Sequence, residues 1–311
     1  MTSLLKHKIY WLRKIFQSTK NPFKVLIFRF GFLKNCDCNF KQFGVIKLSE
    51  KDIKTGFFTV LLVSGSKDIS NNGKKIADEI ISQKDKNIIN LKSAAVKLLN
   101  MRNLGQFLML FEIFVQEDYH LKKTTNNEVV IDIGGNMGIA AIYFANKGYD
   151  VYSFEPIKDV INIARKNLEL NENLKNKVHF IEKAVTDKKG IIKIAYEGLG
   201  CSESSSTYLN SGKFLEVETT TIKDIFNKYQ IEPKILKMDC EGSEYDIIKN
   251  TDLSMFNEII VEYHAFLTGL NPKILINKLK NQGFKVKKIE IDSPDFSQNS
   301  ELGIGFIKAT K

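Results

Sequence analysis

Five residues at the end of an apolar run, an acid, three glycines and an asparagine, are well suited to chemistry. They are Asp132, Gly134, Gly135, Asn136 and Gly138. Glycine lets the backbone turn sharply and approach a ligand closely, and the free N–H groups at the start of the following helix face the bound group. The spacing therefore predicts a nucleotide-binding turn between a strand and a helix.

A second acid follows the next short apolar run, residues 150–154. Glu155 lies about 20 residues after the glycines, where dinucleotide and related folds place a ribose-binding acid. Its two acceptor oxygens suit a cis-diol, and Pro156 ends the strand without offering a competing donor. An isolated acid here would be read as a solvated strand end, but the distance from the glycine turn favours ribose binding.

A third segment joins a buried apolar run, residues 235–238, to an acidic turn and a helix start. Its polar members are Lys237, Asp239, Glu241 and Glu244. Glu241 and Glu244 can bind acceptor hydroxyls, or they can simply begin a helix, where the dipole favours acids. No second acidic or histidine cluster completes an oxygen shell, so we expect no metal ion.

These segments carry a resemblance to a known family. The glycine spacing departs from the G-x-G-x-x-G of dinucleotide-binding folds, whereas D-x-G-x-N-x-G resembles motif I of class I S-adenosylmethionine-dependent methyltransferases. The L-K-x-D-x-E-G-x-E of residues 236–244 resembles the hallmark of FkbM-type methyltransferases. Further matches follow in family order: Asn136, residues 154–156, Asn167, Asn171, residues 217–222 and residues 261–264. The resemblance covers about residues 127–290.

The resemblance implies S-adenosylmethionine as the methyl donor. It assigns donor binding to the glycine turn, to Glu155 with Pro156, and to Asp239, which it places between donor and acceptor. Glu182 and Ala184 follow the run 178–181, at the position where this fold contacts adenine. One short turn is the whole support for that pair.

Transfer of a methyl group to an alcohol leaves a proton to be accepted, and a nearby base accelerates this step by about 10²-fold to 10⁴-fold. His264 ends the run 258–263, which the fold delivers to the rim of the glycine turn, and imidazole titrates near neutral pH. Glu262 points to the same side of the strand and can orient His264 or accept a hydroxyl hydrogen bond itself. A histidine that only satisfies a backbone carbonyl is the structural alternative. His7, His120 and His179 show no partner pattern.

Length and composition fit one catalytic domain with an N-terminal extension. The 311 residues, 43% of them hydrophobic, can bury a sizeable core. The four cysteines show no C-x-x-C pair, so neither a zinc site nor a disulfide framework is expected, and a reducing cytoplasmic location is favoured. No apolar run reaches the length of a spanning helix. We expect residues 1–125 to form the extension and residues 126–311 the methyltransferase domain.

Alternating strands and helices predict a doubly wound α/β domain with a Rossmann-like, mainly parallel sheet. Strands are expected at about 128, 150, 178, 234, 257, 284 and 303, and helices at about 138, 158, 242 and 272. The resemblance implies that the last two strands form an antiparallel edge pair. The insertion 191–222 holds two strand-like runs and a polar loop, residues 198–212, which is either a linker or a substrate loop.

The extension is expected to have α+β structure. A helix near the N-terminus precedes a predicted hairpin of residues 44–49 and 56–64, and helix-like spacing follows at 74–82, 91–99 and 104–115. Most of the net charge of +10 lies before residue 42. The first helix places its apolar side chains on one side and most of its cations on the other. It can therefore lie on an anionic membrane or pack on its own domain; nucleic acid is a less favoured partner.

Together these patterns predict a cytoplasmic S-adenosylmethionine-dependent O-methyltransferase that acts on a hydroxyl of a sugar, glycan or glycolipid-like acceptor. Peripheral contact of this enzyme with a membrane through residues 1–20 stays an open option. Two alternatives remain open. One is a nicotinamide-dependent oxidoreductase on a similar fold, and the other is a non-catalytic, membrane-associated binding protein that contacts the bilayer through residues 1–20. A fold by itself does not fix the acceptor.

Overall fold

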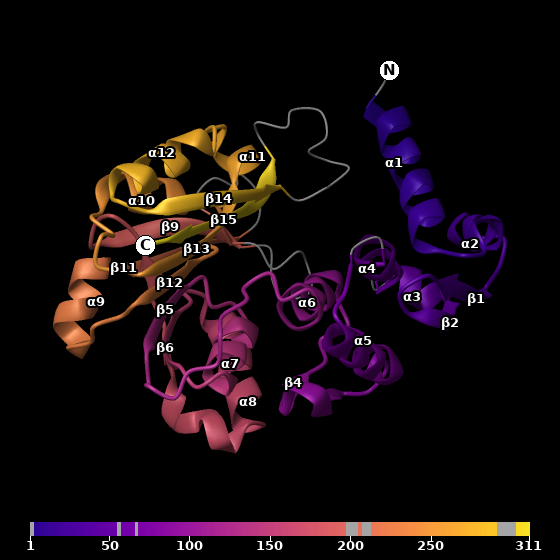
Figure 1. The fold of residues 1–311 in the computed structure, drawn as a ribbon, viewed down its shortest axis with the longest axis horizontal. Coiled ribbons are helices and arrows are strands. Elements are labelled where there is room, and N and C mark those ends of the chain that lie inside the picture. Colours follow the sequence, from indigo (N-terminus) through magenta and orange to yellow (C-terminus); the bar gives the residue numbers. More distant parts are fainter. Residues whose placement is uncertain (1–2, 55–56, 66–67, 197–204, 207–212, 291–302) are drawn as a thin grey trace. The chain divides into compact units, whose positions relative to one another are not determined.

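The computed structural model describes residues 3–54, 57–65, 68–196, 205–206, 213–290 and 303–311 (Figure 1). The chain divides into two compact units, residues 1–120 and 121–311. Independent folding of an N-terminal domain remains a prediction. None of the helices in the described ranges combines the length and apolar character needed to cross a membrane.

The second unit is built on one seven-stranded sheet. From edge to edge the order is β14 (Lys285–Glu290), β15 (Ile304–Thr310), β13 (Glu258–His264), β12 (Ile235–Met238), β5 (Val129–Ile133), β6 (Asp150–Phe154) and β7 (Val178–Ile181). The strands from β13 to β7 run parallel, and β15 is antiparallel to both of its neighbours. The predicted α/β sheet and its antiparallel edge pair are confirmed.

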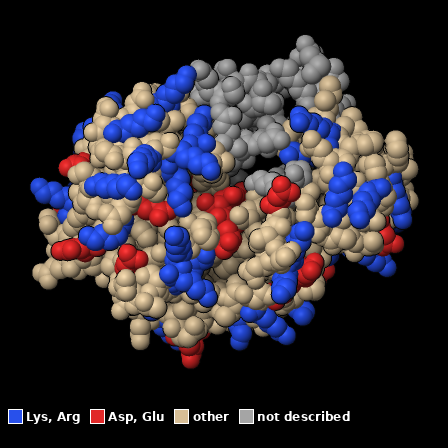
Figure 2. Space-filling view, in the orientation of Figure 1, with Lys and Arg blue, Asp and Glu red and all other residues tan. Residues whose placement is uncertain are grey.

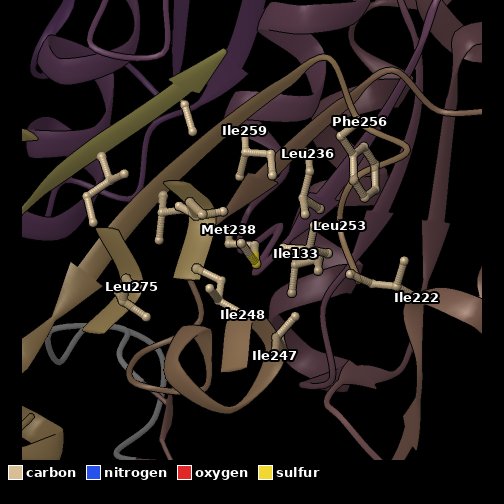
Figure 3. Packing of buried hydrophobic residues seen from close by; sticks show 14 of the residues in the cluster. Ile133, Ile222, Leu236, Met238, Ile247, Ile248, Leu253, Phe256, Ile259 and Leu275 are labelled. Atoms are coloured by element: carbon tan, nitrogen blue, oxygen red, sulfur yellow. The ribbon is translucent and has the colours of Figure 1, made fainter. Parts of the chain in front are cut away.

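Helices cover both faces of this sheet. On one face, α9 (Ile222–Tyr229), α10 (Glu244–Asn250) and α12 (Lys273–Asn281) pack with alternate strand residues into a hydrophobic core (Figure 3). The other face carries α7 (Ile139–Asn146) and α8 (Lys158–Glu169). Burial on both faces explains why the central strands are almost wholly apolar. The short helices Glu172–Lys177 (3-10) and α11 (Ala265–Thr268) complete the unit.

The insertion forms a smaller sheet beside the main one. Its order is β10 (Ser205–Ser206), β9 (Ile191–Tyr196), β11 (Lys213–Thr220) and β8 (Ala184–Val185). The two predicted strands of the insertion are therefore confirmed as β9 and β11, which pair antiparallel. Apart from β10, the polar loop 198–212 lies outside the described residues. Thr221 then caps α9, accepting a hydrogen bond from the Asp224 N–H at 3.1 Å.

The first unit is mixed. Its elements are α1 (Ser3–Ser18), α2 (Pro22–Arg29), β1 (Asn35–Phe40), β2 (Gly44–Ser49), α3 (Glu50–Lys54), α4 (Phe57–Ser64), α5 (Asn71–Gln83), β3 (Ile88–Leu91), a 3-10 turn (Lys92–Ala94), β4 (Val96–Leu99), α6 (Leu104–Leu110) and a π-helical turn (Phe111–Val115). The helices predicted near the N-terminus, at 74–82 and at 104–115 are confirmed.

Two predictions for this unit are wrong. The hairpin partner of β2 is β1, while residues 57–64 form α4. Phe57, Phe58 and Leu61 are all fully buried, so an apolar run read as a strand is a helix surrounded by core. Residues 91–99, predicted helical, belong mostly to the β3–β4 hairpin, because Ala95 adopts a left-handed φ of 53° that ends the turn between them.

Gly138, the last glycine of the turn before α7, is required by both backbone angle and space. Its φ is +75°, and an added Cβ would lie 2.6 Å from a ring carbon of Phe180 and 2.9 Å from the Ala164 Cβ. Gly283 has a φ of +90° but open space around it. Each glycine therefore resists a side chain, and only Gly138 also lacks room for one.

We predict that Gly138→Ala lowers the free energy of unfolding by about 1–2 kcal/mol for the left-handed backbone and a further 1–3 kcal/mol for overpacking. Gly283→Ala, the matched control, should lose only the first amount. Urea unfolding of the two variants measures the difference. Equal losses would contradict the packing role of Gly138.

Candidate functional site

A pocket opens where β5, β6 and β12 end, beside the small sheet. Six of the residues that the sequence assigns to donor binding line it: Gly134, Asn136, Glu155, Pro156, Ala184 and Asp239. Glu241 lines it as well. Phe154, within the matching residues 154–156, forms part of its apolar wall, and sequence reasoning missed other apolar residues there: Ile133, Val185, Ile192 and Ile194. The alternation of β9 marks Ile192 and Ile194 as one face, but the sequence does not say what that face covers.

The glycine turn is shaped by contacts between strands. A Cβ on Gly134, whose φ is +76°, would lie 1.7 Å from the carbonyl oxygen of Asp239. A Cβ on Gly135 would lie 2.0 Å from Oγ of Ser153. Neither Gly135 nor Gly138 lines the pocket. These two glycines serve the packing of the turn, and Gly134 serves both the packing and the pocket.

Glu155 is held in place by backbone donors. Its side chain accepts hydrogen bonds from the Asn136 N–H at 3.1 Å and the Ile157 N–H at 2.8 Å, and the residue is only 5% exposed. Burial raises the pKa of this carboxyl to about 7, against the two backbone donors, which lower it. A hydrogen bond from a ligand hydroxyl would therefore stabilise the charged form of this nearly buried carboxyl.

Lys237 is a buried cation at the centre of the sheet. Its Nζ donates to the Gly134 carbonyl at 2.9 Å and lies 3.1 Å from Oδ1 of Asp132 and 3.7 Å from Oδ2 of Asp239. Burial lowers the pKa of Lys237, but Asp132 and Asp239 outweigh it and raise the pKa above its ordinary value. Ser153 Oγ donates to the other oxygen of Asp132 at 2.7 Å.

Asp132 therefore lies behind the pocket rather than in its wall. It is fully buried and holds Lys237 and Ser153, so it supports the glycine turn from below. The sequence signal for Lys237 was visible, because a lysine stands inside an otherwise apolar strand.

The acidic turn after β12 brings two carboxylates to the pocket. The Asp239 N–H donates to the Ile133 carbonyl at 3.0 Å, which ties the turn to the end of β5. Glu241 has a left-handed φ of +52°, a backbone angle that is rare for a residue with a long side chain. Burial raises the pKa of Glu241 to about 7, although His264 opposes the shift.

His264 lies among three carboxylates. Its Nδ1 is 2.8 Å from Oε1 of the fully buried Glu244, and its Nε2 is 3.7 Å from Oε2 of Glu241 and 3.9 Å from Oδ1 of Asp239. Burial lowers the pKa of His264, but Glu241 and Glu244 raise it well above its ordinary value. This shift favours the protonated form of the imidazole, and in that form His264 cannot accept a further proton.

The remaining predicted residues lie around the site. Glu262 is 8% exposed, does not line the pocket, and helps to raise the pKa values of Lys237 and His264. Glu182 is exposed, 3.9 Å from Arg165, and also outside the lining. Asn167 donates to the Met137 carbonyl at 2.9 Å and accepts from Asn171 through its own carbonyl at 2.7 Å. These two asparagines brace the glycine turn.

Lys237→Met should lower the free energy of unfolding by about 3–5 kcal/mol, because it leaves Asp132 charged and buried without its partner. Adding Asp132→Asn should restore most of the loss, since the amide carries no charge. Lys175→Met, which removes an exposed pair with Glu172, is the matched control and should change stability far less. Urea unfolding measures these changes. A Lys237→Met variant as stable as the parent would contradict the stabilising role of the Lys237–Asp132 pair.

Comparisons with known proteins find matches for the part of the chain that carries the pocket. A family model described as "Methyltransferase FkbM domain" matches residues 132–286, a span that contains every pocket residue named above. The chain is similar to the methyltransferase sdnD of Sordaria araneosa, with 22% identity over 213 residues that cover 57% of this chain and 81% of that protein.

Two solved structures are similar at lower identity. Methyltransferase FkbM from Methylobacillus flagellatus shares 14% identity at a TM-score of 0.42, over 66% of this chain and 54% of that chain. TrmK from M. capricolum, solved with S-adenosyl-homocysteine, shares 18% identity at a TM-score of 0.38, over 60% of this chain and 63% of that chain. On the match of residues 132–286, the chain belongs to the FkbM family of S-adenosylmethionine-dependent methyltransferases.

Proposed function

We propose that this methyltransferase binds S-adenosylmethionine in the pocket at the ends of β5, β6 and β12 and methylates a hydroxyl of a sugar, glycan or glycolipid-like acceptor. One observation carries the proposal: three carboxylates, Glu155, Asp239 and Glu241, line the same pocket inside the FkbM domain. Carboxylates accept hydrogen bonds from hydroxyls, which both the donor's ribose and a sugar acceptor offer.

The chemistry of the pocket wall fits the donor. Glu155 can accept hydrogen bonds from a ribose diol, and Phe154 and Ile194 offer the apolar surface that an adenine ring needs. Asp239, with its side chain 29% exposed, places negative charge where a cationic ligand group is favoured. When bound, S-adenosylmethionine supplies a methyl group carried on a sulfonium cation.

The same charges indicate what kind of acceptor fits. Asp239 and Glu241 keep 29% and 26% of their side chains exposed, so both can meet a second ligand. Two carboxylates side by side repel an anionic acceptor and accept hydrogen bonds from an uncharged polyol. This argument supports a neutral hydroxylated acceptor over a phosphorylated or acidic one.

Glu241 is the group best placed to take the acceptor's proton. It lines the pocket, and its pKa of about 7 leaves it partly deprotonated near neutral pH, as a general base requires. His264 lies behind it as a cation, held at Nδ1 by Glu244. In this assignment His264 is a positioning residue that holds the Glu241 carboxylate, and the sequence-based role of His264 as the base becomes the alternative.

Donor binding is tested first by calorimetric titration of the full chain with S-adenosylmethionine, S-adenosyl-homocysteine and NAD. We expect the first two to bind and NAD not to bind. Glu155→Gln should weaken donor binding roughly 10-fold to 100-fold, because a hydrogen bond to a charged group contributes about 1.5–3 kcal/mol.

Glu182→Gln is the matched control, since Glu182 is exposed and outside the pocket wall; its donor affinity should match the parent. Binding of NAD alone would support the oxidoreductase alternative instead. If both glutamine variants lost donor affinity equally, the assignment of Glu155 to donor binding would be contradicted.

The base is tested by the pH dependence of turnover on hydroxylated acceptors. Because Glu241 must lose its proton to act, the rate should rise with pH through about 7. Glu241→Gln should lower kcat by about 10²-fold to 10⁴-fold while donor affinity is kept. His264→Gln removes the cation that lowers the pKa of Glu241, so the rising limb should move to higher pH. If the rate of Glu241→Gln still rises with pH and that of His264→Gln does not, His264 is the base.

A further inference from the structure

The first unit exposes a group of large apolar side chains on and after α2. Phe23 and Ile27 lie one turn apart and are 71% and 47% exposed; Phe30 and Phe32 follow at 68% and 79%. Phe16 of α1, 45% exposed, meets the Phe23 ring edge-on with 5.5 Å between centroids. We refer to these five residues as the Phe23 surface. An exposed apolar group of this size marks an interaction site.

The Phe23 surface is held by hydrogen bonds and packing. The Gly31 N–H donates to the Phe28 carbonyl at 2.9 Å and the Phe32 N–H to the Ile27 carbonyl at 3.1 Å, with Gly31 at a φ of +81°. This pattern is a Schellman motif, which ends α2 in one defined turn. On the opposite side of α2, Phe28 is fully buried and packs on Phe58 at 5.6 Å. The exposed rings are thus presented by a docked helix.

The charge around the Phe23 surface has one sign. Residues 1–36 contain eight lysines and arginines and no acidic residue. Lys20, Lys24, Arg29 and Lys34 are all exposed. Figure 2 shows basic side chains over α2, which lies at the right of the view. Cations beside exposed aromatic rings complement a surface that is anionic outside and apolar within.

The structure also divides the roles of α1. Lys14 and Ile15 are buried, so one side of α1 packs within its own unit, whereas Ile9, Leu12 and Phe16 stay exposed. One side of α1 therefore packs on its own unit, and contact of the exposed side with a membrane stays a prediction. The strongest exposure lies beyond α1, in residues that the expected contact at 1–20 did not include.

We propose that the Phe23 surface binds the headgroup region of an anionic phospholipid bilayer, with its rings at the boundary of the acyl chains and its cations at the lipid phosphates. Aromatic side chains favour this boundary, and basic residues near an anionic leaflet strengthen binding about fivefold each. A single-stranded nucleic acid would use the rings for stacking but offers no apolar layer for Ile27. The proposal does not depend on methyl transfer.

The test is co-sedimentation of the full chain with phosphatidylcholine vesicles, with and without phosphatidylglycerol. We expect binding only to the anionic vesicles, and weakening with salt. Phe23→Ser/Phe30→Ser/Phe32→Ser should abolish binding. Lys24→Glu/Arg29→Glu/Lys34→Glu should weaken it by about 100-fold or more.

Two controls separate these changes from general effects. Val45→Ser removes an exposed apolar side chain, 66% exposed, elsewhere in the first unit. Lys166→Glu/Lys249→Glu/Lys285→Glu changes the net charge equally on exposed positions of the second unit. Both should bind like the parent, and all variants should keep the donor affinity measured by calorimetry. Absence of binding to anionic vesicles, equal loss in the controls, or binding of single-stranded RNA through the same residues without vesicle binding would overturn the proposal.

Discussion

The site depends on one buried ion pair, between Lys237 of β12 and Asp132 of β5. The same ammonium group donates to the Gly134 carbonyl and lies near Asp239, so a single cation joins the ends of two strands and the turn between sheet and helix. A charge buried in a sheet is tolerated only with such partners. The glycine turn, the acidic turn and the pocket between them therefore share one electrostatic support.

Burial then gives similar side chains different chemistry. Glu155 and Glu241 are carboxylates whose pKa values rise to about 7 because the protein removes water from them, while Asp132 faces a permanent cation. The pKa of His264 is raised as well, in this case by the acids around the ring, and this shift favours its charged form. The Lys237–Asp132 pair thus keeps its charges, whereas Glu155 and Glu241 can exchange a proton near neutral pH. Acid–base chemistry depends on such a difference between neighbouring groups.

The sequence was sufficient where local pattern and tertiary role coincide. Two features follow from apolar runs and glycines alone: strands that end close to Asp132 and Glu155, and a helix that begins after Gly138. It was insufficient where an apolar run fits two structures, as in α4, where Phe57, Phe58 and Leu61 are fully buried in a helix. It also could not show the charge state of His264, because Glu244 reaches that ring only through the fold.

Part of the apolar wall of the pocket comes from the small sheet. Ile192 and Ile194 belong to β9, which pairs with β11 in the small sheet and shares no strand with the seven-stranded sheet that holds the carboxylates. The carboxylates and this part of the cavity wall are thus encoded in different segments of the chain. Substitutions at Ile192 and Ile194 can therefore change the shape of the cavity while the carboxylates at the ends of β6 and β12 keep their positions.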